Sequence, residues 1–178
     1  MPKGGERFRV AVSGHRRLPA DGRVPAGVDA ALDAVAAAAG AAAAVVSSLA
    51  EGADRLVAER GLARPGWSLE VVLPLDAADY ERDFEAGGSV AAFRSLLARA
   101  DAVDRVPPQP TREDAYWAAG LEVLGRSDVL VAVWDGRPPR GRGGTGEVVA
   151  RARAVGRPLA WVRVPDGDVV REGWPWAG

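Results

Sequence analysis

Short apolar runs recur along the chain and are separated by segments with helical spacing. Such runs are expected to be buried strands, because a strand covered on both faces is continuously apolar rather than alternating. The strongest of them is Asp128–Trp134, with the sequence DVLVAVW, and the weakest is Ala102–Val106. The remaining predicted strands are Phe8–Ser13, Ala43–Ser47, Ser68–Leu73 and Pro158–Val164.

The segments between these runs predict helices. In Gly27–Ala39, for example, Val28, Leu32 and Val35 recur at the spacing of one helix face. The other predicted helices are Ala53–Leu62, Ala77–Phe84, Val90–Ala100, Arg112–Arg126 and Gly146–Val155. The tail, Asp166–Gly178, is expected to be irregular, with Trp174 and Trp176 packing back onto the chain or across a dimer.

Strands that alternate with helices indicate βαβ units. The expected fold class is α/β, a Rossmann-like doubly wound and mostly parallel sheet of about six to seven strands with helices on both faces. A chain of 178 residues corresponds to one domain at roughly 150 residues per domain. We find no internal repeat and no linker, so residues 1–178 are expected to form a single domain.

Composition narrows the possible functions. The 23 basic and 24 acidic residues give a net charge of −1. This balance disfavours nucleic acid as a partner, because domains that bind nucleic acid are usually strongly basic. With no cysteine and one histidine, disulfides, thiol catalysis and multi-histidine metal sites are excluded, and no metal or cofactor is expected. No signal peptide and no run of ~18 apolar residues is found, so we expect a cytoplasmic protein without membrane contact.

Polar and small residues follow four of the predicted strands. Ligands of open α/β sheets bind outside the carboxyl ends of the strands, so these residues are candidates for one shared site. After the first, second and third strands they are Ser13, Gly14, His15, Arg16, Ser48, Glu51, Gly52, Asp54 and Pro74. After Asp128–Trp134 they are Asp135, Gly136, Gly143, Gly144, Thr145, Gly146 and Glu147.

The segment GRGGTGE, residues 141–147, precedes a predicted helix. Glycines there let backbone N–H groups approach an anion, and the helix N-terminus adds partial positive charge. Thr145 can cap this helix and donate its hydroxyl to a phosphate. The segment is neither a Walker A loop nor GxGxxG with an acid about 20 residues on. The alternative is a glycine-rich loop with a threonine cap and no ligand.

The other candidates also have two interpretations. His15 and Arg16 can hold an anion or a sugar hydroxyl, or they can be a turn residue and a solvated side chain. Ser48 and Asp54 can line the site or only cap the helix that follows them. Glu147 can be catalytic, or it can simply be favoured in the first turn of its helix.

Taken in order, three blocks resemble the SLOG superfamily, which unites the Rossmann-like domains of the DprA/Smf and Lonely guy (LOG) proteins. They are VAVSGHR (Val10–Arg16), SSLAEGADRLVAE (Ser47–Glu59), and DVLVAVWDG with GRGGTGEVVARAR (Asp128–Gly136, Gly141–Arg153). The second is similar to the DprA signature SGxAxGID and the third to the LOG signature PGGxGTxxE. Here the acid, Glu147, falls two residues after Thr145 rather than three, which rotates it by about 100° on a helix.

The resemblance implies a cleft for a nucleotide or nucleotide-derived ligand, in a sensor or binding protein. The phosphate would lie at Gly143–Gly146, the sugar near Ser13–His15, and the base between the first and second strand ends. The resemblance also implies a homodimer. The arginines Arg137, Arg140 and Arg142 are expected to form a mobile lid over the phosphate.

Two alternatives stay open. One is a nucleoside 5′-monophosphate phosphoribohydrolase or another N-glycosidic enzyme, with Glu147, Glu51 or Asp54 as the carboxylate and Arg16 on the phosphate. The offset of Glu147 argues against it. The other is a DprA-like single-stranded DNA-binding module, which the balanced charge and the low aromatic content of 6% disfavour.

Overall fold

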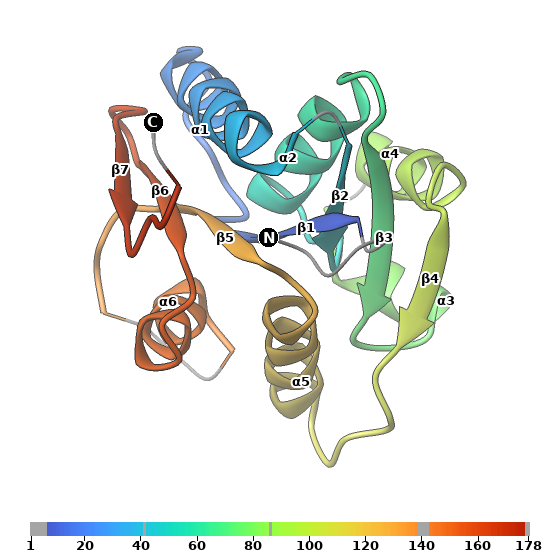
Figure 1. Ribbon diagram of the computed structural model, residues 1–178. Coiled ribbons are helices and arrows are strands. Elements are labelled where there is room, and N and C mark those ends of the chain that lie inside the picture. Colours follow the sequence, from blue (N-terminus) through green and yellow to red (C-terminus); the bar gives the residue numbers. More distant parts are fainter. Residues whose placement is uncertain (1–6, 41, 86, 139–142, 177–178) are drawn as a thin grey trace.

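A computed structural model of the chain describes residues 7–40, 42–85, 87–138 and 143–176. Its centre is a seven-stranded sheet with the strand order β4-β3-β2-β1-β5-β6-β7, shown in Figure 1. All neighbouring strands are parallel except β6 and β7. The strands are β1 (Phe8–Gly14), β2 (Ala43–Ser47), β3 (Ser68–Leu73), β4 (Ala102–Arg105), β5 (Val129–Trp134), β6 (Leu159–Arg163) and β7 (Val169–Glu172).

Helices cover both faces of the sheet, as a doubly wound fold requires. Helices α1, α2 and α4 lie on one side of the sheet, and α5 and α6 lie on the other (Figure 1). The helices are α1 (Arg23–Ala39), α2 (Ala53–Leu62), α3 (Ala77–Tyr80), α4 (Gly88–Leu97), α5 (Arg112–Gly125) and α6 (Thr145–Ala154), with a 3₁₀ turn at Glu81–Asp83. The predicted Rossmann-like fold class is confirmed.

The apolar runs of the central strands are buried because the sheet is covered on both faces, whereas all four residues of the edge strand β4 are exposed, against the expectation of a buried strand there. Successive side chains of a strand point to opposite faces, so β5 serves two cores. Val131 and Val133 belong to the core beneath α1, α2 and α4, whereas Leu130 and Ala132 belong to the core beneath α5 and α6. All six residues of β5 are buried, which explains its uninterrupted apolar sequence.

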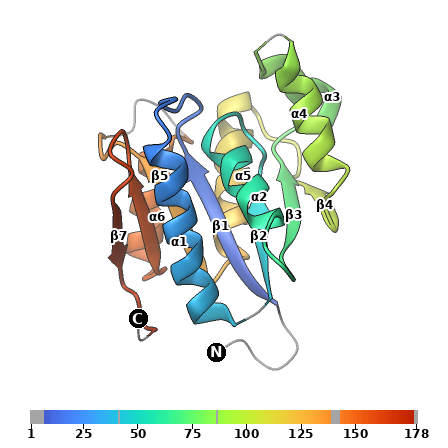
Figure 2. The same ribbon diagram turned by 90° about the horizontal axis from the view of Figure 1, so that it is seen from above.

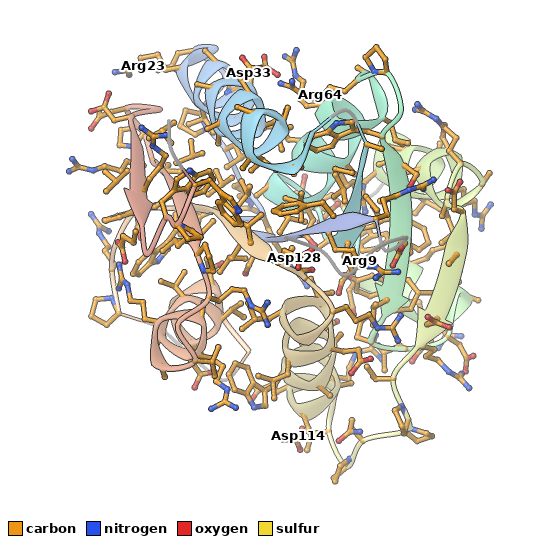
Figure 3. The ribbon with its side chains drawn as sticks, viewed as in Figure 1. Arg9, Arg23, Asp33, Arg64, Asp114 and Asp128 are labelled. Carbon is orange, nitrogen blue, oxygen red and sulfur yellow. The ribbon has the colours of Figure 1, made fainter. Side chains whose placement is uncertain are left out.

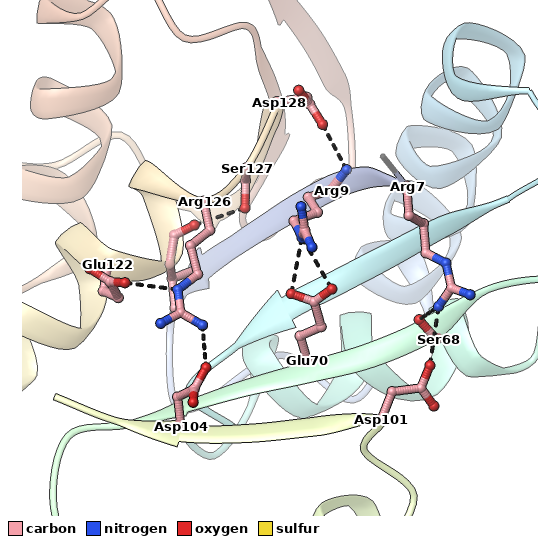
Figure 4. Close-up of polar contacts among 11 residues, drawn as sticks. Arg7, Arg9, Ser68, Glu70, Asp101, Asp104, Glu122, Arg126, Ser127 and Asp128 are labelled. Atoms are coloured by element: carbon pink, nitrogen blue, oxygen red, sulfur yellow. Dashed lines mark hydrogen bonds and ion pairs between the residues drawn. The ribbon is translucent and has the colours of Figure 1, made fainter. Parts of the chain in front are cut away.

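Ion pairs connect neighbouring elements at the surface. Figure 3 labels Asp33 of α1 and Arg64, which follows α2; the Arg64 guanidinium lies 2.7 Å from the Asp33 carboxylate. On the sheet face that carries α5, Arg9 donates from Nε to both oxygens of Glu70 at 3.0 and 3.1 Å (Figure 4). Asp128 accepts a hydrogen bond from the Arg9 N–H at 2.8 Å. Charged side chains therefore cover this part of the sheet.

Three local expectations were wrong. The tail is not wholly irregular: Val169–Glu172 forms β7, which pairs antiparallel with β6. A run of four residues on a sheet edge is too short for its alternation to be distinctive. The first helix begins at Arg23 rather than at Gly27. The predicted helix Ala77–Phe84 is divided into α3 and the 3₁₀ turn.

The strand order creates a switch point beside β1. The chain runs outward from β1 through β2, β3 and β4, and then returns to β5 on the other side of β1. In Figure 2 the loops that follow β1, β2 and β5 lie at the same end of the molecule. In such sheets this point is where a crevice opens for ligands. Within the described residues, no helix is long and apolar enough to cross a membrane.

Candidate functional site

A cavity of about 470 Å³ opens at the carboxyl edge of the sheet, at the switch point. Most of the residues predicted from the strand ends line it. They are Ser13, Gly14, His15, Arg16, Ser48, Asp54, Pro74, Asp135, Gly143, Gly144, Thr145 and Gly146. Four separate loops of the sequence are thus brought to one hollow.

Two glycines allow β1 and α2 to meet beneath this cavity. A Cβ at Gly14 would overlap the Cβ of Ala53 and lie 2.7 Å from the Val133 carbonyl oxygen. Gly52 has φ +77°, and a Cβ there would overlap the carbonyl oxygens of His15 and Arg16. The Ala53 N–H donates to the His15 carbonyl at 3.0 Å. This close packing places the start of α2 against the end of β1.

The N-terminus of α6 forms one end of the cavity. Gly144 is the N-cap and makes no side-chain capping hydrogen bond, and Thr145 is the first helical residue. The predicted capping role of Thr145 is therefore wrong, and its hydroxyl is left to the cavity that it lines. Because the first N–H groups of a helix have no partner within it, Thr145 and Gly146 offer donors to an anion.

His15 and Asp135 lie together on the rim between β1 and β5. The Asp135 N–H donates to Nε2 of His15 at 3.1 Å, and an Asp135 oxygen lies 3.3 Å from the same nitrogen. Burial opposes ionisation of Asp135, but the Arg137 N–H and the nearby His15 outweigh it and lower the Asp135 pKa. The rim thus carries a stable carboxylate.

Asp54 is a buried carboxylic acid in the cavity wall, with 6% of the residue exposed. The Ser47 hydroxyl donates to it at 3.1 Å, and the N–H groups of Ser48 and Ala50 donate as well. Burial raises the pKa of Asp54 to about 6, although these hydrogen bonds oppose the shift. A group that titrates near neutral pH in a cleft is a candidate for ligand recognition or proton transfer.

The loop between β2 and α2, which precedes Asp54, is strained and braced. Leu49 has φ +56°, a left-handed conformation that costs a non-glycine residue about 1–3 kcal/mol. Nε of the buried Arg55 donates to the Leu49 carbonyl at 3.0 Å. Arg55 also donates to the Ser89 carbonyl and hydroxyl, both at 2.8 Å, and its guanidinium lies 4.4 Å from the centre of the Phe84 ring. Strain of this kind persists where surrounding contacts enforce it.

Residues of α5 and of the segment after β3 complete the wall, and our strand-end rule did not find them. Tyr80 is 1% exposed, and within the described residues its hydroxyl has no hydrogen-bond partner. The Tyr116 ring lies under the exposed Arg16 guanidinium, 5.5 Å away, and its hydroxyl donates to Asp83. The other residues missed are Val12, Ala50, Ala119, Gly120, Val123, Trp134, Pro138 and Val148, together with Arg137, which was predicted only as part of a lid.

The residues of α5 that line the cavity recur in the sequence at a helical spacing. Tyr116, Gly120 and Val123 lie on one face of α5, at intervals of four and three residues. Gly120 also lets α5 approach α6, since a Cβ there would lie 3.2 Å from Val148. A helix face that packs on a core and one that borders a cavity share this spacing, so the sequence did not distinguish them.

Four predicted residues do not line the cavity. The Glu147 carboxylate turns back to accept a hydrogen bond from the Gly143 N–H at 2.5 Å. Gly136 lies in a turn beside the Trp161 ring. Glu51 and Gly52 border a neighbouring depression, which shares Arg16 with the cavity. Arg140 and Arg142 of the predicted lid lie outside the described residues.

Glu51 is occupied by its own neighbours. It accepts hydrogen bonds from the Glu85 N–H at 2.8 Å and from the Ser89 hydroxyl. Burial raises the Glu51 pKa, but these bonds outweigh it, so the net shift is downward. Glu51 therefore joins the loop before α2 to Glu85 and to the first turn of α4. Among the described residues, no group of three or more His, Asp or Glu side chains is placed to hold a metal ion.

Comparison with known proteins identifies a shared fold. No family model matches the chain, and no curated protein matches its sequence. The X-ray structure of DNA processing protein A (DprA) from Streptococcus pneumoniae superposes with a TM-score of 0.54 at 17% sequence identity. The match covers 90% of this chain and 53% of that one, so the chain spans about half the length of the DprA structure. The chain thus has a DprA-like, Rossmann-type fold.

Proposed function

We propose that this protein is a SLOG-type domain that binds a nucleotide or a nucleotide-derived ligand in the cavity at the switch point. The observation that carries the proposal is that one cavity is lined both by the N-terminus of α6 and by the buried acid Asp54. A phosphate suits the N–H groups at the start of α6, and a polar ring system suits the part of the cavity beside Asp54.

The phosphate end combines several donors. The N–H groups at the start of α6 and the Thr145 hydroxyl face an anion that enters the cavity. Arg16 and Arg137 also line the cavity. Arg16 forms no ion pair within the described part of the chain, so its charge is available to a ligand. Together with the donors at the start of α6, such a cation would supply phosphate affinity without a Walker A lysine, although Arg16 itself lies beside Tyr116 and near Asp54 rather than on α6.

The first test compares nucleoside monophosphates with the corresponding nucleosides by isothermal titration calorimetry. We expect the monophosphates to bind at least about tenfold more tightly, because charge-assisted hydrogen bonds are among the stronger polar contacts. Thr145→Val should weaken monophosphate binding about three- to tenfold and leave nucleoside binding unchanged, whereas Thr145→Ser should restore it. If no nucleotide binds at millimolar concentration, the proposal is wrong.

The hydrolase alternative is tested in parallel by incubating the protein with nucleoside monophosphates and NAD and measuring the free base by chromatography. Glu147→Ala is the control. Loss of base release in this variant would assign the carboxylate to catalysis. The hydrogen bond from the Gly143 N–H to Glu147 instead favours a role in holding the loop. We therefore expect ligand retention without base release.

A further inference from the structure

Phosphate binding at α6 leaves two buried polar side chains of the cavity unexplained. Asp54 and Tyr80 both line it, and they are 6% and 1% exposed. Within the described residues Asp54 forms no ion pair, and the Tyr80 hydroxyl has no hydrogen-bond partner. Burying such groups is costly unless a partner completes their hydrogen bonds. Both side chains line the cavity, so a bound ligand that displaces water there can complete their hydrogen bonds.

Their chemistry defines what the ligand must present. An ionised carboxylate has about four acceptor positions, and the Ser47 hydroxyl with two backbone N–H groups occupies three of those of Asp54. One acceptor position is left for the cavity. Tyr80 adds a hydroxyl that can donate. The pair therefore matches a ligand edge with one N–H donor and one acceptor.

The fold places this pair away from the phosphate end. Asp54 follows β2 and Tyr80 follows β3, whereas α6 follows β5, on the other side of β1. Strands β3 and β5 are three strand spacings apart, or roughly 14 Å. A nucleotide whose phosphate lies at Thr145 would direct its base across β1 toward Asp54 and Tyr80.

We infer that Asp54 and Tyr80 read the base of the bound nucleotide and select one whose edge carries an amino group beside an unprotonated ring nitrogen. Adenine and cytosine have this edge. The amino N–H donates to the Asp54 carboxylate, and the ring nitrogen accepts from the Tyr80 hydroxyl. This inference rests on the proposed function and specifies the ligand class of the same site.

A base with an oxo group has the opposite polarity. Its carbonyl oxygen would face the Asp54 carboxylate, acceptor against acceptor, and its ring N–H would leave the Tyr80 hydroxyl without an acceptor. A site built from buried polar groups discriminates strongly against a ligand that leaves them unpaired. Arg55 braces Leu49 in the loop between β2 and α2, so the start of α2 with Asp54 is held in place before the ligand arrives. Ordering of the site on binding therefore costs little affinity.

The test measures the affinities of AMP against IMP, and of CMP against UMP, by calorimetry on the full chain. Each pair differs only in the amino or oxo group and the ring proton that accompanies it. We expect the wild-type protein to prefer the amino form about tenfold or more. Tyr80→Phe, which removes a hydroxyl without a partner among the described residues, should reduce that preference about three- to tenfold. Asp54→Asn should reduce it further.

Asp135→Asn is the matched control, since it also removes a carboxylate from the cavity wall, but on the β5 side. It should change the affinities for AMP and IMP alike and leave their ratio intact. Thermal unfolding of each variant checks the fold. If Asp54→Asn does not fold, Tyr80→Phe alone decides, because it keeps the ring contacts with Phe84 and Phe93.

The outcomes separate this inference from the proposed function. Equal binding of AMP and IMP by the wild-type protein overturns the inference and leaves nucleotide binding intact. Absence of binding by all four nucleotides overturns both. A preference that survives in Tyr80→Phe and in a folded Asp54→Asn overturns the assignment of these residues. If Tyr80→Phe instead removes a preference for AMP over 2′-deoxy-AMP, the pair reads the ribose and the inference is wrong.

Discussion

At the residue scale, Asp54 shows how a carboxyl group in a cavity wall can oppose stability. Its carboxyl group is removed from water without an ion pair in the described part of the chain, and burial raises its pKa from 3.8 to about 6. A group whose pKa is raised on folding favours the folded state at low pH. The stabilising contribution of Asp54 is complete below about pH 3.8 and is lost as the pH rises through about 6. At neutral pH the ionised Asp54 therefore weakens the fold.

We predict that Asp54→Asn stabilises the protein at pH 8 by about 1–3 kcal/mol. The amide is neutral, and it can accept from the Ser47 hydroxyl or donate to it. The gain should disappear near about pH 3, where wild-type Asp54 is largely protonated in both the folded and the unfolded state. Urea unfolding of both proteins at each pH measures the difference. Glu59→Asn, on an exposed position of the same helix, should show no such pH-dependent gain.

At the element scale, one side chain joins α2 to α4 and to the loop between β2 and α2. Arg55 is 7% exposed; it contacts Leu49, Ser89 and Phe84, and burial lowers its pKa. Its Nη2 is buried without a hydrogen-bond partner among the described residues. Hydrogen bonds from a buried guanidinium and packing of its stem both stabilise this junction.

Arg55→Ala should therefore lower the free energy of unfolding by about 2–4 kcal/mol. It should also accelerate amide hydrogen exchange in α4 and in Ser48–Ala50 more than in β5, which lies in the middle of the sheet. Arg94→Ala is the matched control, because Arg94 lies on α4 itself and its ion pair with Glu81 is exposed. A uniform loss of protection in both variants would contradict the role of Arg55 as a junction.

At the scale of the whole molecule, the net charge bears on the choice of partner, whereas the shared fold shows the architecture alone. The DprA-like fold is shared with a protein described as DNA-processing, but this chain spans about half the length of that structure. Its net charge of −1 supplies little of the counterion release that drives binding to nucleic-acid backbones. The predicted homodimer also belongs to this scale and stays a prediction.

We predict that single-stranded DNA binds more weakly than about 10⁻⁴ M at physiological salt. Fluorescence anisotropy of a labelled oligonucleotide, repeated at several salt concentrations, measures this affinity. Micromolar binding that falls steeply with salt would instead support the DNA-binding alternative. A nucleotide that competes for the same binding would place the DNA in the cavity.

Much of the fold and part of the site were predictable because they depend on local pattern. The uninterrupted apolar run of β5 indicated a strand buried on both faces, and the alternation of strands and helices indicated a doubly wound sheet. The rule for parallel sheets then placed His15, Asp54 and Thr145 at one edge, and all three line the cavity. The short edge strand β7 has too few residues to produce a comparable signal.

The sequence by itself determined most of the strands and helices and which strand ends meet at one edge of the sheet. Only the tertiary structure decided the environment of each side chain there. Tyr80 and Tyr116 enter the cavity because the segment after β3 and α5 pack beside β1, and Glu147 is left out because it turns back to Gly143. Periodicity records that a residue is buried, whereas its exposure to a cavity, its hydrogen-bond partners and its pKa depend on residues distant in the chain.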